Sequence, residues 1–155
     1  MKTLGSIKVK IVNLEPMLVA SAYAFSKSPE QEAQQILNNW AEPRRLLNDL
    51  KNHPIFGFNN PPPSGPDQKY GYEFWIKVDP NTEPEKDIRI CFFKGGRYAV
   101  ARCTGANTIY ETWVALFEWC KAQNYKNGMH QGLEKLISSD SPETMVLDLY
   151  CPICE

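Results

Sequence analysis

The chain has 155 residues, and its 17 Lys and Arg residues nearly balance its 18 Asp and Glu residues, leaving a net charge of −1. This length predicts one domain, residues 1–155, that buries enough surface to fold without disulfide or metal cross-links. A near-zero net charge without a basic run argues against direct binding of nucleic acid. No apolar run approaches the roughly 18 residues of a membrane span, which argues against a membrane partner.

Five cysteines are scattered over apolar segments, and an odd number without a framework favours a reducing compartment, so we expect a cytoplasmic protein. Cys151 and Cys154 have the spacing of a redox pair or of half a zinc site, but no second pair accompanies them. We therefore expect no metal and no other cofactor. Residues 17–25 are apolar, but Glu15 and Pro16 precede this short run, so we do not interpret it as a signal peptide.

In the first half of the chain, β-branched and aromatic residues predict four strands, at residues 6–14, 17–25, 55–58 and 70–78. We expect the first two to form a hairpin. A helix is predicted from Ser28, as N-cap of a capping box with Gln31, to about Leu50, with Pro43 kinking or ending its first part. The Pro-rich residues 59–68 read as a loop, either a pocket lid or a surface crossing.

The second half repeats this order. Strands are predicted at 88–93 and 97–103, joined as a hairpin by the turn at 94–96, and a helix follows from Asn107 or Thr108 to about Gln123. A helical turn at 133–137 and a final strand at 144–151 complete the chain. The predicted fold is α+β, a duplicated strand-strand-helix-strand module. Its pseudo-repeats, about 6–79 and 87–152, would be related by a pseudo-twofold axis with a ligand cleft between the halves.

Strand 70–78 carries the most informative residues. Period 2 places Glu73 and Trp75 on the face opposite its main apolar residues, and in the final strand Asp148 and Tyr150 repeat this acid–aromatic pair. Burying a carboxylate costs several kcal/mol unless something pairs with it, so a buried Glu73 would indicate a function. The alternative is a solvent-facing Glu on an edge or open sheet, and spacing alone leaves both open.

Several segments together resemble the GyrI-like small-molecule-binding domain. This domain is the effector-binding module at the C-terminus of some AraC- and MerR-type bacterial regulators, and it also occurs as free-standing proteins. The order and spacing of these segments carry the resemblance across nearly the whole chain: 15–20, 55–61, 70–75, 95–100, 112–113 and 148–153.

The resemblance implies that Glu73 is the acid of an aromatic pocket for lipophilic cations and other flat organic molecules, as in multidrug binding. Cation–π attraction of about 0.5–2 kcal/mol per ring and the carboxylate counter-charge would hold such a ligand. Strand parity makes two aromatic residues the first candidates for the pocket wall, and four others follow: Trp75 and Tyr150, then Trp113, Phe117, Phe58 and Tyr98. Each has an alternative interpretation as a core residue, above all the two on the second helix.

Two functions follow from the resemblance. The first is small-molecule binding, in which the protein senses or sequesters a compound or acts on a protein partner such as a topoisomerase or a regulator. The alternative is a hydrolase of electrophilic cyclopropane-containing genotoxins, with Glu73 orienting or activating water and aromatic residues holding the substrate. The sequence does not decide between the two functions, so we take binding as the default prediction, and the ligand and the oligomeric state stay open.

Overall fold

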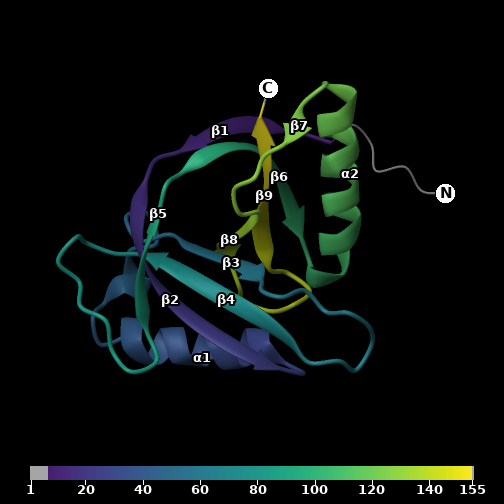
Figure 1. Ribbon diagram of the computed structural model, residues 1–155. Helices are drawn as coiled ribbons and strands as arrows, with labels where there is room; N and C mark the ends of the chain where they lie inside the picture. Colours follow the sequence, from purple (N-terminus) through teal and green to yellow (C-terminus); the bar gives the residue numbers. More distant parts are fainter. Residues whose placement is uncertain (1–6, 155) are drawn as a thin grey trace. The chain divides into compact units, whose positions relative to one another are not determined.

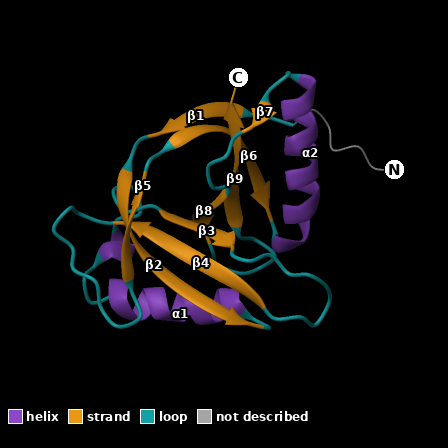
Figure 2. Cartoon of the chain, in the orientation of Figure 1, coloured by secondary structure: helices purple, strands orange, loops and turns teal. Residues whose placement is uncertain are grey.

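The structure, a computed structural model, describes residues 7–154 and divides the chain into two compact units. We call residues 16–94 the Glu73 unit, and residues 7–15 with 95–154 the Asp148 unit. Each unit contains one α-helix and a set of antiparallel strands, as the ribbon in Figure 1 and the secondary-structure colouring in Figure 2 show. The predicted α+β class is therefore confirmed.

The Glu73 unit is a four-stranded antiparallel sheet with one helix. Its strands lie in the order β3-β4-β2-β5, which places β4 and β2 at the centre. The elements are β2 (Met17–Ser26), α1 (Pro29–Ala41), a short 3-10 helix η1 (Leu46–Asn48), β3 (Ile55–Asn59), β4 (Tyr70–Lys77) and β5 (Arg89–Phe93).

Helix α1 packs against β2 and β4 through one apolar side. Its residues Ala33, Leu37 and Trp40 are buried, and the alanines at 20 and 22 of β2 are fully buried as well. Small side chains let a helix approach a sheet closely. By strand parity, the opposite sheet face carries Ser21 and Glu73, so the helix does not cover that face.

The predicted bounds of this helix need two corrections. Ser28 is the N-cap, but its side chain makes no capping hydrogen bond, so the predicted capping box is absent. Instead the Ser28 amide donates to Ser26 Oγ at 3.1 Å. The helix ends at Ala41 rather than near Leu50, because Pro43 has no backbone N–H to continue the helical hydrogen bonds, as one of the two predicted effects of this proline required.

The Asp148 unit is also a four-stranded antiparallel sheet with one helix, and its strands lie in the order β1-β6-β9-β8. A two-stranded pairing of β7 with β9 adds to it. The elements are β1 (Lys10–Leu14), β6 (Gly96–Thr104), a 3-10 helix η2 (Ala106–Thr108), α2 (Ile109–Ala122), β7 (Lys126–Asn127), β8 (Leu133–Ser138) and β9 (Val146–Cys154).

The core of the Asp148 unit lies between α2 and its sheet. Leu116 and Cys120 of α2 pack with alternate residues of β9, including Leu147, Leu149 and Cys151, as the parity of the final strand predicted. Residues 133–137 are not a helical turn but part of strand β8, which pairs with β9. The apolar spacing of these residues fits both the helical period of about 3.6 and the strand period of 2. Pairing with the buried strand β9 favours the strand.

Both predicted hairpins are wrong. Strand β2 pairs with β4 and β5, whereas β1 pairs with β6. Strand β6 in turn lies between β1 and β9, so β5 and β6 are not partners. The boundary between the two units falls at these two short connections, residues 15–16 and 94–95. A short connection favours pairing of its flanking strands, but burial of each strand within a sheet outweighs it here.

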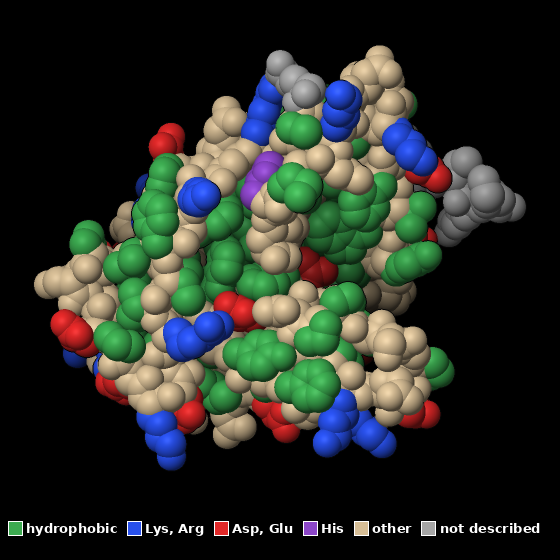
Figure 3. Space-filling model, in the orientation of Figure 1, with side chains coloured by type: hydrophobic (Ala, Val, Ile, Leu, Met, Phe, Trp, Pro, Cys, Tyr) green, Lys and Arg blue, Asp and Glu red, His purple; other side chains and the backbone are tan. Residues whose placement is uncertain are grey.

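The surface carries no extended region of one charge on the face that Figure 3 presents, because Lys and Arg (blue) are interspersed with Asp and Glu (red). No helix within residues 7–154 has the length and apolar composition needed to span a membrane.

Candidate functional site

Glu73 is a buried carboxylate held by neutral donors. Its Oε2 accepts hydrogen bonds from Ser21 Oγ at 2.6 Å and from the Trp75 indole Nε1 at 2.7 Å. Its Oε1 accepts one from Asn60 Nδ2 at 3.2 Å. With 4% of its surface exposed, Glu73 is not the solvent-facing residue of the alternative interpretation. These donors compensate part of the cost of burying the charge.

Three segments of the Glu73 unit position these donors. Trp75 follows Glu73 by two residues on the same face of β4, and Ser21 stands opposite Trp75 in the neighbouring strand β2. Asn60 comes directly after β3, where its N–H donates to the Gly71 carbonyl at 2.8 Å. Gly71 is suited to this close approach, because a Cβ there would lie 1.8 Å from the Asn60 carbonyl oxygen.

Aromatic rings flank the carboxylate. Phe58 stands opposite Glu73 in strand β3, and its ring meets the Trp75 ring edge-on at 4.8 Å between centroids. On the other side, the Phe93 ring lies 5.4 Å from Trp75. The structure thus groups three predicted site residues, Glu73, Trp75 and Phe58. It adds Phe93, which the sequence prediction missed because it paired strand 88–93 with strand 97–103.

Among the described residues, one charged side chain accompanies Glu73. Arg89 Nη2 lies 3.5 Å from Glu73 Oε2, and 67% of the Arg89 side chain is exposed against 5% of that of Glu73. Arg89 stands opposite Ser21 in the pairing of β5 with β2. The sequence reasoning missed this residue, because the predicted hairpin assigned β5 to the wrong neighbour.

Tyr98 and Tyr150 lie together in the Asp148 unit. Their rings approach edge-on at 5.4 Å, and the Tyr98 hydroxyl donates to the Gln131 carbonyl at 2.5 Å. Burial raises the pKa of both phenols, so neither hydroxyl ionises near neutral pH. Tyr98 is completely buried, which fits its alternative interpretation as a core residue.

Trp113 and Phe117 form a second aromatic group in this unit. Their rings stack at 5.6 Å on helix α2, and the Trp113 indole donates to Glu134 Oε2 at 3.1 Å. Trp113 packs against the core between α2 and the sheet, whereas 46% of Phe117 is exposed. By strand parity Tyr150 points to the other face of this sheet, so these two residues do not line one surface with it.

Asp148, the predicted counterpart of Glu73, has a different environment. The guanidinium of Arg102 binds it bidentately, with Nε to Oδ1 at 2.8 Å and Nη2 to Oδ2 at 3.2 Å. Arg102 stands directly opposite Asp148 in β6, and Lys135 stands opposite it in β8. The pair also raises the pKa of Arg102 through this hydrogen bonding and charge attraction. Asp148 is therefore a structural anion.

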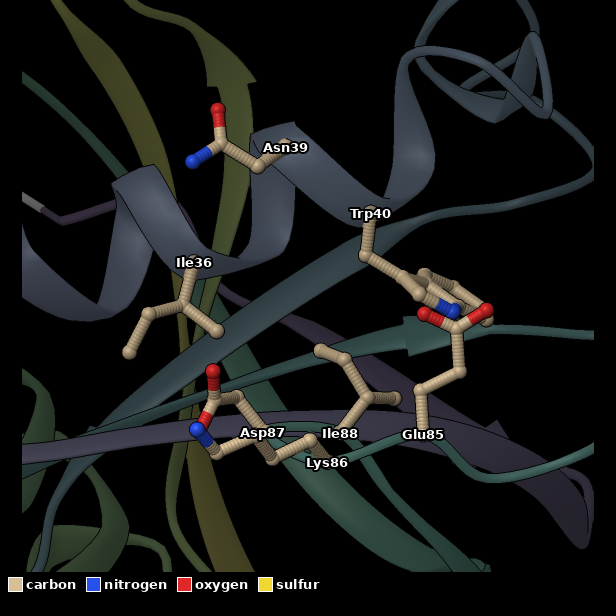
Figure 4. A pocket seen from close by; sticks show the side chains of 7 residues that line it. All are labelled: Ile36, Asn39, Trp40, Glu85, Lys86, Asp87 and Ile88. Carbon is tan, nitrogen blue, oxygen red and sulfur yellow. The ribbon is translucent and has the colours of Figure 1, made fainter.

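A separate pocket of about 210 Å³ lies in the Glu73 unit, between α1 and the segment 85–88. Figure 4 shows Trp40 and Glu85 at one end of it and Ile36 and Asp87 at the other. Arg44 stacks over the Trp40 ring at 4.4 Å and pairs with Glu85. Within the described chain the buried Trp40 Nε1 has no hydrogen-bond partner. No predicted site residue lines this pocket.

The two terminal cysteines differ in exposure, since one is a core residue and the other lies on the surface. Cys151 is buried, and burial raises the pKa of its thiol to about 12, whereas Cys154 is exposed. Within residues 7–154, no three His, Cys, Asp or Glu side chains gather closely enough to hold a metal ion.

Comparison with known structures gives the same fold at low sequence identity. The C-terminal domain of EcmrR is 11% identical, with 97% of this chain and 99% of that chain covered at a TM-score of 0.71. A hydrolase from Listeria innocua is 12% identical (95% and 92% covered, TM-score 0.70). SAV2435, solved with bound tetraphenylphosphonium, is 14% identical (96% and 94% covered, TM-score 0.59). These identities establish the shared fold alone.

A family model identifies the protein family, which the similar structures do not. No curated protein sequence matches the chain, but the model of the Cass2 family, described as integron-associated effector binding protein, matches residues 10–153. This match covers nearly the whole described chain and agrees with the fold. The chain belongs to the integron-associated effector-binding proteins, and this confirms its predicted resemblance to GyrI-like small-molecule-binding domains.

Proposed function

We propose that this protein binds a lipophilic cation that carries aromatic groups, with the Glu73 carboxylate as the counter-charge and Trp75 and Phe58 as aromatic neighbours. Small-molecule binding follows from membership of an effector-binding family. The finer proposal concerns the kind of ligand and the residue that recognises it.

The observation that carries the proposal is the buried carboxylate itself. Three neutral groups, Ser21, Trp75 and Asn60, donate to Glu73, but they bring no positive charge. Its one charged partner in the described chain is the mostly exposed Arg89, at 3.5 Å. A carboxylate buried in this way keeps a negative potential that attracts a cation.

The neighbouring rings favour a particular kind of cation. Trp75 is only partly buried, and it contacts the rings of Phe58 and Phe93. A cation over an aromatic face gains about 0.5–2 kcal/mol, and an aromatic ligand also buries apolar surface against these rings. Tetraphenylphosphonium, which one structure of the same fold contains, has this combination of charge and apolar surface and is a suitable probe.

The test is calorimetric titration of tetraphenylphosphonium into wild type and Glu73→Gln, with neutral triphenylphosphine oxide as the matched uncharged ligand. We expect the substitution to weaken cation binding by about 1–3 kcal/mol and to leave binding of the neutral ligand nearly unchanged. Glu83→Gln removes one negative charge from an exposed residue of the same unit and serves as the control. Equal cation affinity in all three proteins would contradict the proposal.

A hydrolase is the second candidate, and one observation favours it. Within residues 7–154, Glu73 Oε1 accepts a single hydrogen bond, from Asn60, so it retains the capacity to bind a water molecule. One structure of the same fold is described as a hydrolase. If an electrophilic cyclopropane is a substrate, Glu73→Gln will abolish turnover while largely preserving substrate binding. Unchanged turnover in this variant would exclude Glu73 as the group that activates water.

The four candidates of the Asp148 unit stay predictions from the sequence: Tyr98, Tyr150, Trp113 and Phe117. A protein partner, such as a topoisomerase or a regulator, also stays a prediction.

A further inference from the structure

Arg89 is bound to Glu73 by charge but not by a hydrogen bond. The 3.5 Å separation of Nη2 and Oε2 exceeds the usual 2.7–2.9 Å of a charge-assisted bond between nitrogen and a carboxylate. Oε2 is instead occupied at short range by Ser21 and Trp75. The guanidinium therefore offsets part of the carboxylate charge, while the neutral donors supply the hydrogen bonds.

The position of Arg89 allows it to move. Strand β5 lies at one end of the strand order of the Glu73 unit, beside β2 only, and two thirds of the Arg89 side chain is exposed. A long side chain at such a position exchanges rotamers quickly. Movement of Arg89 leaves all three neutral donors of Glu73 in place, so the carboxylate stays held while its charged partner leaves.

We infer that Arg89 is a displaceable counter-cation that determines which cations the Glu73 site accepts, an inference that rests on the proposed function. An incoming cation replaces Arg89 beside the carboxylate, and one ion pair is exchanged for another. The charge of the ligand then gives a smaller net advantage than it would beside a carboxylate without a cationic neighbour, because part of it only replaces the charge of Arg89.

This exchange selects for a chemical class of ligand. A small hydrophilic cation such as tetramethylammonium replaces the charge of Arg89 and gains little else. A large aromatic cation replaces the charge and also buries apolar surface beside Trp75 and Phe58. Arg89 thereby makes the site selective for bulky lipophilic cations over small ones.

The experiment uses four proteins, wild type, Arg89→Gln, Glu73→Gln and the double variant, titrated with tetraphenylphosphonium and with tetramethylammonium. We expect Arg89→Gln to tighten binding of tetraphenylphosphonium about sevenfold, the size of one Coulomb interaction at this distance in water. Measurable tetramethylammonium binding should appear in this variant. In the Glu73→Gln background the same substitution should change affinity less than about twofold, because the carboxylate charge for which Arg89 competes is gone.

Lys94→Gln is the matched control, since it removes an exposed positive charge one residue beyond β5. Equal tightening by Lys94→Gln, or undiminished tightening in the Glu73→Gln background, would show general repulsion and overturn the exchange. If Glu73→Gln weakens cation binding but Arg89→Gln does not tighten it, the exchange is wrong and the proposed function stands. If neither wild type nor Arg89→Gln binds tetraphenylphosphonium, both are wrong.

Discussion

Glu73 and Asp148 are two buried acids on central strands of two four-stranded sheets, yet their surroundings differ. The residues directly opposite Glu73 in the adjacent strands are aromatic, Tyr23 and Phe58. Those directly opposite Asp148 are cationic, Arg102 and Lys135. Cross-strand neighbours are close side-chain contacts in a sheet, and here they place a cationic side chain directly opposite Asp148 but not opposite Glu73.

This difference separates a structural anion from an available one. Asp148 has a bidentate guanidinium partner, so its charge and geometry are both satisfied within the chain. Glu73 has neutral donors at short range and a guanidinium at a longer distance. An acid beside an aromatic residue is therefore not enough to indicate a ligand site, and the distance to the nearest cation is the more informative quantity.

The same substitution at the two arginines should give the clearest contrast. Arg102→Gln leaves Asp148 buried without its bidentate partner, and we expect a loss of about 2 kcal/mol of unfolding free energy, allowing for screening of a half-exposed guanidinium. Arg89→Gln should cost less than about 0.5 kcal/mol. Urea denaturation of both variants measures the difference. Equal losses would mean that the two pairs are equivalent and that the contrast drawn here is wrong.

The parity of strands 70–78 and 144–151 was readable from the sequence, and so was the grouping of Glu73 with Trp75. Alternation with period 2 is a local property that neighbouring residues specify. The role of Asp148 was not readable, because its partners Arg102 and Lys135 come from strands 46 and 13 residues earlier. Register between strands depends on tertiary burial, which a single strand does not encode.

The prediction of the first hairpin was wrong for the same physical reason. A two-residue connection at Glu15-Pro16 has the length of a hairpin loop, and the pattern alone favours the hairpin. Pairing of β2 with β4 and β5 buries its alternating residues on both sides instead. The pairing of β5 with β2 places Arg89 beside Glu73. The wrong hairpin prediction is therefore also the reason why Arg89 was missed as a site residue.

A smaller effect tests whether neutral donors hold Glu73. Ser21→Ala removes the 2.6 Å hydrogen bond to Oε2 from a buried position, and we expect a loss of about 1 kcal/mol of unfolding free energy, because Trp75 and Asn60 still donate. Thermal and urea denaturation measure it. The contrast predicts a further result: Ser21→Ala should lose little stability when combined with Glu73→Gln, since an amide oxygen accepts a weaker bond than a carboxylate. If Ser21→Ala still cost about 1 kcal/mol of unfolding free energy in the Glu73→Gln variant, Ser21 would contribute through packing alone.

A small effect is also expected for Glu73→Gln itself, whose unfolding free energy should change by less than about 1 kcal/mol. The amide oxygen replaces Oε2 and accepts from Ser21 and Trp75, while the amide nitrogen replaces Oε1 and faces Asn60. Asn60 accommodates a donor by rotating its own amide by 180°, which presents its oxygen in place of its nitrogen. Asp148→Asn offers no such adjustment, because a guanidinium has only donors and cannot accept from the new amide nitrogen. We therefore expect Asp148→Asn to destabilise the protein more than Glu73→Gln does, and the reverse order in urea denaturation would assign the structural role to Glu73 instead.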